Sequence, residues 1–122
     1  MLKLIFIIDD NDANLTVAAR ALEDEYRILT MASAQKMFSL LEKKTPDLIL
    51  LDVEMPDISG IEAAVRLKEN PQWKDIPVLF LTSYRDEKLL SDAEKSGALE
   101  VINKPFEPAE LLECVKKYIK TQ

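Results

Sequence analysis

The 122-residue sequence contains no histidine, a single cysteine and two glycines. The absence of histidine excludes histidine catalysis, histidine metal ligation and a phosphohistidine carrier role for this chain. The lone cysteine, Cys114, cannot form an internal disulfide, which is typical of proteins in a reducing cytoplasm. It precedes Val115, which is predicted to face the core, so we interpret Cys114 as a small packed side chain rather than a reactive thiol.

Basic residues are also in the minority, with 16 lysines and arginines against 22 acidic residues and a formal charge of -6. Such a surface repels phosphates, so we predict no direct nucleic acid binding. The apolar start of the chain stops at Asp9, which is too short for a signal peptide or a membrane span. We therefore predict a cytoplasmic protein without membrane association.

The length suits one domain over residues 1–122, and its apolar residues form two kinds of pattern. Short, continuous apolar runs indicate strands that are buried on both faces, at residues 4–8, 48–51 and 78–81. The more polar run at residues 26–31 indicates an edge strand, and residues 99–102 are a short fifth candidate.

Between these runs, apolar residues recur with helical spacing. Five helices are predicted, of which the fourth, at residues 85–96, has the thinnest apolar stripe. Ser59 and Glu62 have the spacing of a capping box before the third helix, and Gly97 follows the fourth, where a left-handed residue is expected. The loop at residues 69–75 is interpreted as a surface connection with Trp73 packed on a helix.

Strands that alternate with helices indicate an α/β fold with a parallel sheet covered by helices on both faces. We predict five strands in the flavodoxin-like order 2-1-3-4-5. The switch point then lies between the first and third strands, where ligands bind at the carboxyl ends.

Polar residues follow four of the predicted strands. Asp9 and Asp10 end the first strand, Asp52 the third, Thr82 the fourth and Lys104 the fifth. The topology alone therefore brings these residues to one crevice.

Three carboxylates in one crevice repel each other unless a cation joins them. Because the chain has no histidine, the donors are oxygens, which select a hard ion such as Mg²⁺, or else Mn²⁺ or Ca²⁺. A lysine and a hydroxyl on the same rim suit a phosphoryl group. Each residue alone has an ordinary explanation, such as a solvated strand end with Asp12 capping the first helix; the combination favours a site.

Four segments carry a resemblance to a known family: IFIIDDND, PDLILLDVEMPDISGIE, LFLTS and VINKPFEPAEL. With these motifs the chain resembles the receiver domains of two-component response regulators over nearly its whole length. The resemblance implies that Asp52 accepts a phosphoryl group. It also implies a direct Mg²⁺ ligand at Asp10, assistance through water from Asp9, and a third protein ligand in the backbone carbonyl of Glu54.

The resemblance further implies that Lys104 pairs with the phosphoryl oxygens, that its bond to Pro105 is cis, and that Thr82 hydrogen-bonds the transferred group. The implied donor is a phosphohistidine on a sensor histidine kinase or a histidine phosphotransfer protein. An attached effector domain and a single-domain shuttle both remain open. The implied chemistry is limited to the chain's own phosphoryl transfer and autodephosphorylation, so it is not predicted to act as an enzyme on other substrates.

One position departs from the family pattern, because Val101 stands where many members carry an aromatic residue that turns inward on activation. We therefore expect a displacement of the fourth helix, read at the surface of that helix, the fifth strand and the fifth helix. Glu54 and Tyr84 are expected to tune the lifetime of the phosphate.

Two other functions compete with this interpretation. The first is a Mg²⁺-dependent phosphatase of the haloacid-dehalogenase type, whose nucleophile follows the first strand; here the adjacent pair Asp9 and Asp10 ends that strand, and the expected nucleophile, Asp52, lies on the third. The second is an interaction domain that never carries phosphate.

Overall fold

The computed structural model describes residues 2–83 and 86–119 of the chain. Strands and helices alternate through these residues, as the sequence predicted. In chain order they are β1 (Leu4–Ile8), α1 (Asp12–Leu22), β2 (Arg27–Met31), α2 (Ala34–Leu41), β3 (Leu48–Asp52), α3 (Gly60–Glu69), β4 (Val78–Thr82), α4 (Glu87–Lys95), β5 (Glu100–Asn103) and α5 (Pro108–Tyr118).

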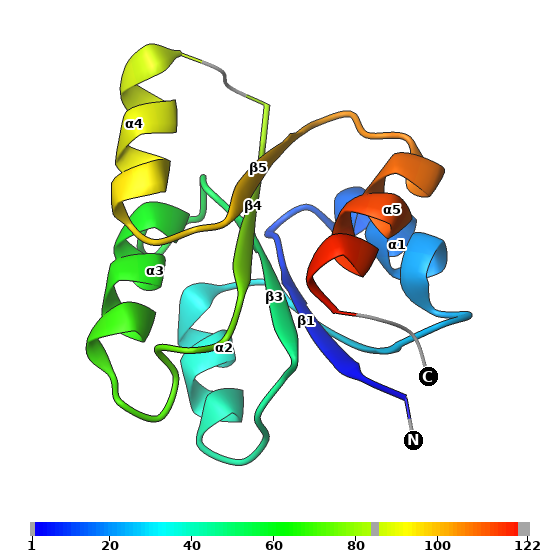
Figure 1. Ribbon diagram of the computed structural model, residues 1–122, viewed down its shortest axis with the longest axis horizontal. Coiled ribbons are helices and arrows are strands. Elements are labelled where there is room, and N and C mark those ends of the chain that lie inside the picture. The colour runs from blue at the N-terminus through cyan, green and yellow to red at the C-terminus, as the bar shows by residue number, and fades with distance from the viewer. Residues whose placement is uncertain (1, 84–85, 120–122) are drawn as a thin grey trace.

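The strands form one parallel sheet in the order β2-β1-β3-β4-β5, which confirms the predicted fold class (Figure 1). β2 lies at one edge, as its polar composition indicated, and β5 at the other. Two strands run one residue further than predicted, so that β3 ends on Asp52 and β4 on Thr82. These two polar side chains therefore sit on the rigid sheet itself.

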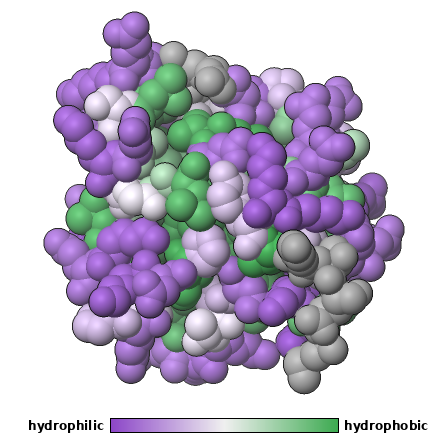
Figure 2. Space-filling view, in the orientation of Figure 1, coloured by the Kyte–Doolittle hydropathy of each residue, from purple (hydrophilic) through white to green (hydrophobic). Residues whose placement is uncertain are grey.

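The helices cover the sheet in two layers (Figure 1). Alternate residues of β1 divide between them: Ile5 and Ile7 pack with residues of α1 and α5, while Phe6 and Ile8 pack with residues of α2, α3 and α4. All four side chains are fully buried. In the space-filling view hydrophilic side chains occupy most of the visible surface (Figure 2).

The predicted boundaries of the helices are mostly confirmed. The Ser59 hydroxyl accepts the Glu62 N–H at 3.1 Å before α3, and Gly97 follows α4 with a φ of 92°. One assignment was wrong: the cap of α1 is Asn11, whose side chain accepts the Asn14 N–H, and not Asp12. Asn11 is the capping residue because the helix begins at Asp12. The Asp12 carboxylate lies in the first turn, where its negative charge is favourable to the helix dipole.

α4 is confirmed as a helix within the described residues, while Arg85, in its predicted first turn, lies outside them. Ala93 is its only fully buried side chain, so α4 is the helix held least by packing. No helix in residues 2–83 and 86–119 has the length and apolar character needed to cross a membrane.

Two further side chains lie as predicted. Trp73 is half-buried, and its ring packs at a 35° tilt on Phe38 of α2, with centroids 5.8 Å apart. Cys114 is buried in the layer of α1 and α5. Burial, together with the nearby Glu100 carboxylate, raises the pKa of Cys114 to about 12, which makes a reactive thiolate unfavourable at neutral pH.

Candidate functional site

The predicted site residues meet at the carboxyl end of the sheet. Asp9 and Asp10 follow β1, Asp52 ends β3, and Lys104 follows β5. These four residues line one open cleft together with five others, of which only Glu54 was predicted from the sequence. The five are Asn11, Asn14, Glu54, Met55 and Pro56. The additional residues come from the start of α1 and from the loop after β3, where no periodic pattern pointed to them.

Three carboxylates converge in this cleft. Asp9, Asp10 and Asp52 each offer an oxygen that lies within 4.8 Å of the other two. Asp9 is fully buried and Asp52 is 2% exposed, whereas Asp10 faces solvent. The cluster is therefore open on one side and closed beneath.

Lys104 bridges the two buried carboxylates. Its Nζ lies 2.8 Å from Oδ2 of Asp9 and 3.1 Å from Oδ1 of Asp52. The lysine is held in place because its backbone N–H donates to the Thr82 carbonyl at 2.9 Å, which extends the ladder between β4 and β5. The following bond to Pro105 is cis, as expected.

The cluster of Asp9, Asp10, Asp52 and Lys104 carries more negative than positive charge. Burial and the neighbouring Asp9 carboxylate raise the pKa of Asp52 to about 7, against the opposing influence of Lys104. Burial lowers the pKa of Lys104, but its contacts with Asp9 and Asp52 outweigh burial and hold that pKa above the ordinary value. Lys104 is therefore charged, and one lysine does not balance three carboxylates.

The donor set fits a hard divalent cation. Every ligand atom available in the cluster is a carboxylate oxygen. Oδ1 of Asp9 accepts the Asn11 N–H at 3.0 Å, while the buried Oδ2 has the ion pair with Lys104 but no hydrogen bond among the described residues. A cation in the cleft would relieve the repulsion among these carboxylates.

Thr82 is buried at the end of β4 and interacts with the loop after β3. Its hydroxyl donates to the two carboxylate oxygens of Glu54 at 3.3 and 3.4 Å. This contact was not predicted, because residues 28 positions apart in sequence give no local signal of pairing. Val101 is half-buried on β5 and packs against the layer of α2, α3 and α4. Tyr84 lies outside the described residues.

Comparisons with known proteins agree with this geometry. The family model for the response regulator receiver domain matches residues 5–116. The chain is 37% identical over 119 residues to the phosphate regulon transcriptional regulatory protein PhoB of Pseudomonas aeruginosa, covering 97% of this chain and 52% of PhoB. It is 28% identical to the polar-differentiation response regulator DivK of Brucella abortus, with 98% of both chains covered.

Among solved structures, the chemotaxis protein CheY4 of Vibrio cholerae superposes with a TM-score of 0.92 at 25% identity, covering 98% of this chain and 100% of CheY4. The haloacid-dehalogenase alternative finds no support, because the matched family, the named relatives and the superposed structure are signalling proteins of one kind. The chain belongs to the receiver domains of two-component response regulators, the phosphoryl-accepting switches of those signalling systems.

Proposed function

We propose that Asp52 is the phosphoacceptor of this receiver domain, and that the domain occupies residues 1–122. The observation that carries the assignment is the position of Asp52 within the cluster: its buried carboxylate lies among Asp9, Asp10 and Lys104 in the cleft. Its contacts with Lys104 and with the Glu54 N–H both use Oδ1. We assign the attacking lone pair to the other oxygen, Oδ2.

The donor is proposed to be a phosphohistidine on a partner kinase or phosphotransfer protein, since this chain has no histidine of its own. A bond forms between the Asp52 oxygen and phosphorus, and the bond between phosphorus and the imidazole nitrogen breaks, with the electron pair left on nitrogen. Lys104, already charged and fixed between two carboxylates, neutralises the transferred group. The Thr82 hydroxyl, released from Glu54, donates to a phosphoryl oxygen.

We propose Mg²⁺ as the cation of the site. Asp9, Asp10, Asp52 and the backbone carbonyl of Glu54 would hold it, with Asp10 as a direct ligand and Asp9 acting through water. When bound, the ion screens the negative nucleophile from the incoming anion. Hydrolysis of the acyl phosphate at the same site would reset the switch, without turnover of unrelated phosphate esters. Glu54, at the mouth of the cleft, is proposed to set the rate of this hydrolysis.

The test is labelling by phosphoramidate or acetyl phosphate in the presence of Mg²⁺, read by intact-mass spectrometry. The wild-type chain should gain one phosphoryl group that hydroxylamine removes, as expected of an acyl phosphate. Asp52→Asn should gain none, whereas Asp24→Asn, at an exposed carboxylate in the turn after α1, should label normally. Labelling of Asp52→Asn at the wild-type rate would exclude Asp52 as the acceptor.

A further inference from the structure

The loop between β3 and α3, residues 53–59, carries the Glu54 carbonyl to the cleft and forms neither helix nor strand. Its two ends are tied together, because the Gly60 N–H donates to the Val53 carbonyl at 2.7 Å. A Cβ atom at Gly60 would lie 2.2 Å from the Asp52 carbonyl oxygen, so α3 begins directly against the backbone of the proposed acceptor. Close backbone contacts thus fix the base of the loop.

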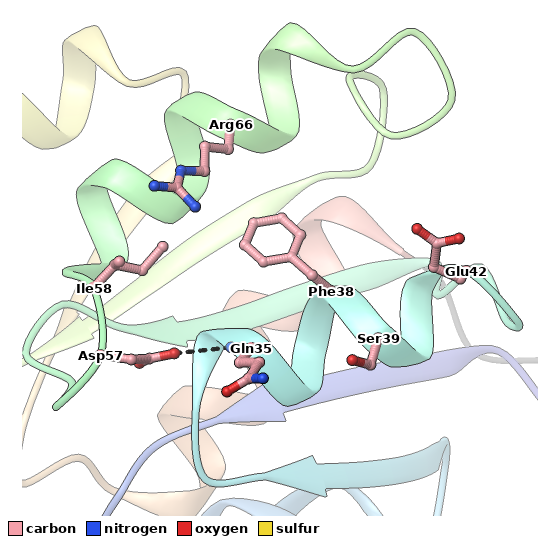
Figure 3. Close-up of a pocket in the computed structure, with 7 residues that line it drawn as sticks. All are labelled: Gln35, Phe38, Ser39, Glu42, Asp57, Ile58 and Arg66. Carbon is pink, nitrogen blue, oxygen red and sulfur yellow. Dashed lines mark hydrogen bonds between the residues drawn. The ribbon is translucent and has the colours of Figure 1, made fainter.

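The far side of the loop is fixed by a different element. The Asp57 carboxylate accepts the Gln35 N–H at 2.9 Å (Figure 3). It also accepts the Ala34 N–H at 3.4 Å, and both donors lie in the first turn of α2. α2 has a cap from its own chain as well, since the Ser33 hydroxyl accepts the Lys36 N–H at 3.2 Å. The start of α2 is therefore capped twice, once locally and once by a residue 22 positions away from Gln35.

This second cap is favourable in charge as well as in geometry. A carboxylate at the N-terminus of a helix meets unpaired N–H groups and the positive end of the helix dipole. Although burial acts to raise the pKa of Asp57, the backbone N–H groups of Gln35, Ile58 and Ala34 hold that pKa below the ordinary value. Asp57 is therefore ionised at neutral pH, and its link to α2 is a charge-assisted one.

We infer that Asp57 is a positioning residue for phosphoryl acceptance: by docking the loop on α2, it holds the Glu54 backbone at the rim of the carboxylate cluster. This inference rests on the proposed function, in which that carbonyl is a cation ligand. Asp57 itself is not among the residues that line the carboxylate cleft. Without it, the loop is still held at its base, by the contacts of Glu54 with Asp52 and Thr82, and by the half-buried side chains of Met55 and Ile58. These contacts restrain the Glu54 N–H, the Glu54 carboxylate and two apolar side chains, and leave the direction of the Glu54 carbonyl to the far side of the loop.

The experiment compares two caps of the same helix. Asp57→Ala removes the link between the loop and α2, whereas Ser33→Ala removes a cap of α2 that does not touch the loop. Mg²⁺ affinity is measured by calorimetry and the initial rate of phosphoramidate labelling by mass spectrometry, at a temperature where circular dichroism shows both variants folded. Because partners that orient a metal ligand typically change affinity by 10–100-fold, we expect Asp57→Ala to bind Mg²⁺ about tenfold more weakly and to label more slowly. Ser33→Ala should match wild type in both.

Two further arms separate positioning from the alternatives. Asp57→Asn keeps one acceptor oxygen for the Gln35 N–H, so it should recover part of the lost affinity. The comparison is repeated in about 0.5 M KCl, where the screening length is a few ångströms and a distant charge no longer acts on the cation. Equal losses in Asp57→Ala and Ser33→Ala, or a loss that disappears in high salt, would overturn the inference. Failure of wild type to bind Mg²⁺ would instead contradict the proposed function.

Discussion

Asp52 is a buried carboxylate placed beside another buried carboxylate, Asp9, and this arrangement costs stability when the cleft holds no cation. Its pKa of about 7, against an ordinary value of 3.8, means that the folded state binds this proton more tightly than the unfolded state does. The contribution of Asp52 to stability therefore falls as pH rises from about 4 to about 7. The charge that the proposed nucleophilic attack requires is the same charge that destabilises the cleft without a cation.

We accordingly expect Asp52→Asn to unfold at a higher temperature than wild type at pH 8 in the presence of EDTA. The amide removes the repulsion with Asp9 and remains able to hydrogen-bond. A gain of about 1 kcal/mol would raise Tm by about 4–8 °C in a domain near this size. Thermal unfolding followed by circular dichroism measures the difference, which should shrink as the pH is lowered toward 4.

Addition of Mg²⁺ should favour wild type, because a ligand that binds only the folded state stabilises it by mass action. Asp24→Asn provides the control for removal of an unrelated carboxylate. A lower Tm for Asp52→Asn than for wild type at pH 8 in EDTA would show that the buried carboxylate stabilises the metal-free fold.

Tyr118 provides a second prediction about a single residue. Its phenol donates to Glu100 at 2.8 Å, and this hydrogen bond, with burial and the charge of Glu100, raises the pKa of Tyr118 to about 12. Stability from this pair should be complete below pH 10 and decline as the pH rises toward 12. Tyrosine ring shifts in an NMR titration should show one phenol near 12, assigned by its absence in Tyr118→Phe. Glu100→Gln should bring that pKa down toward 10, and a Tyr118 phenol that titrates at 10 in wild type would contradict the hydrogen bond.

At the scale of elements, α4 depends on its cap more than the other helices do, because Ala93 is its only fully buried side chain. Asp86 caps it by accepting the Leu89 N–H at 2.7 Å. Asp86→Ala should cost about 1 kcal/mol, as caps typically do, and most of that loss should appear as faster amide exchange within residues 87–96.

Ser59→Ala is the matched control for the cap of α4, since Ser59 caps α3, which buries Gly60, Ala63, Ala64 and Leu67. In Ser59→Ala, loss of the cap should lower the free energy of unfolding of the whole domain. Amides of α3 should then exchange at about the rate set by global unfolding. The same pattern of exchange for both variants would mean that α4 is as firmly integrated as α3.

Elements of this fold could be predicted where the signal is local. The continuous apolar runs of β1, β3 and β4 located each strand within one residue, and the Ser59 cap located the start of α3. The position of the cleft could be predicted from the topology, because the carboxyl ends of parallel strands lie at the same edge of the sheet. The contacts of Glu54 with Thr82 and of Asp57 with α2 could not be predicted, since they join residues more than 20 positions apart whose types are equally common on solvated loops.

For the whole molecule, the contact between Thr82 and Glu54 suggests how occupancy of the site spreads. Under the proposed function, a phosphoryl group on Asp52 would compete with the Glu54 carboxylate for the Thr82 hydroxyl. When Thr82 changes partner, the loop after β4 should follow, and the motion reaches the weakly packed α4. We propose that the α4, β5 and α5 surface, including Leu89, Glu100 and Val101, carries the output.

Chemical-shift mapping with beryllofluoride, which mimics the bound phosphoryl group, tests this output surface. We expect the largest changes from Thr82 to Ser96 and along β5, with none in Asp52→Asn. Because Val101 has no ring to rotate, its own methyl shifts should change less than the amides of α4. Changes limited to α1 and α2, with α4 silent, would place the output elsewhere.

The pairing of Trp73 with Phe38 also has an optical consequence. The only tryptophan of the chain is held on α2, and it is not among the residues that line the carboxylate cleft. Its emission therefore reports the packing of α2, and cation binding should alter it through the link from Asp57 to that helix rather than by contact quenching. The molecule thus carries an intrinsic fluorescent probe that packs against α2, the helix on which the loop between β3 and α3 is docked.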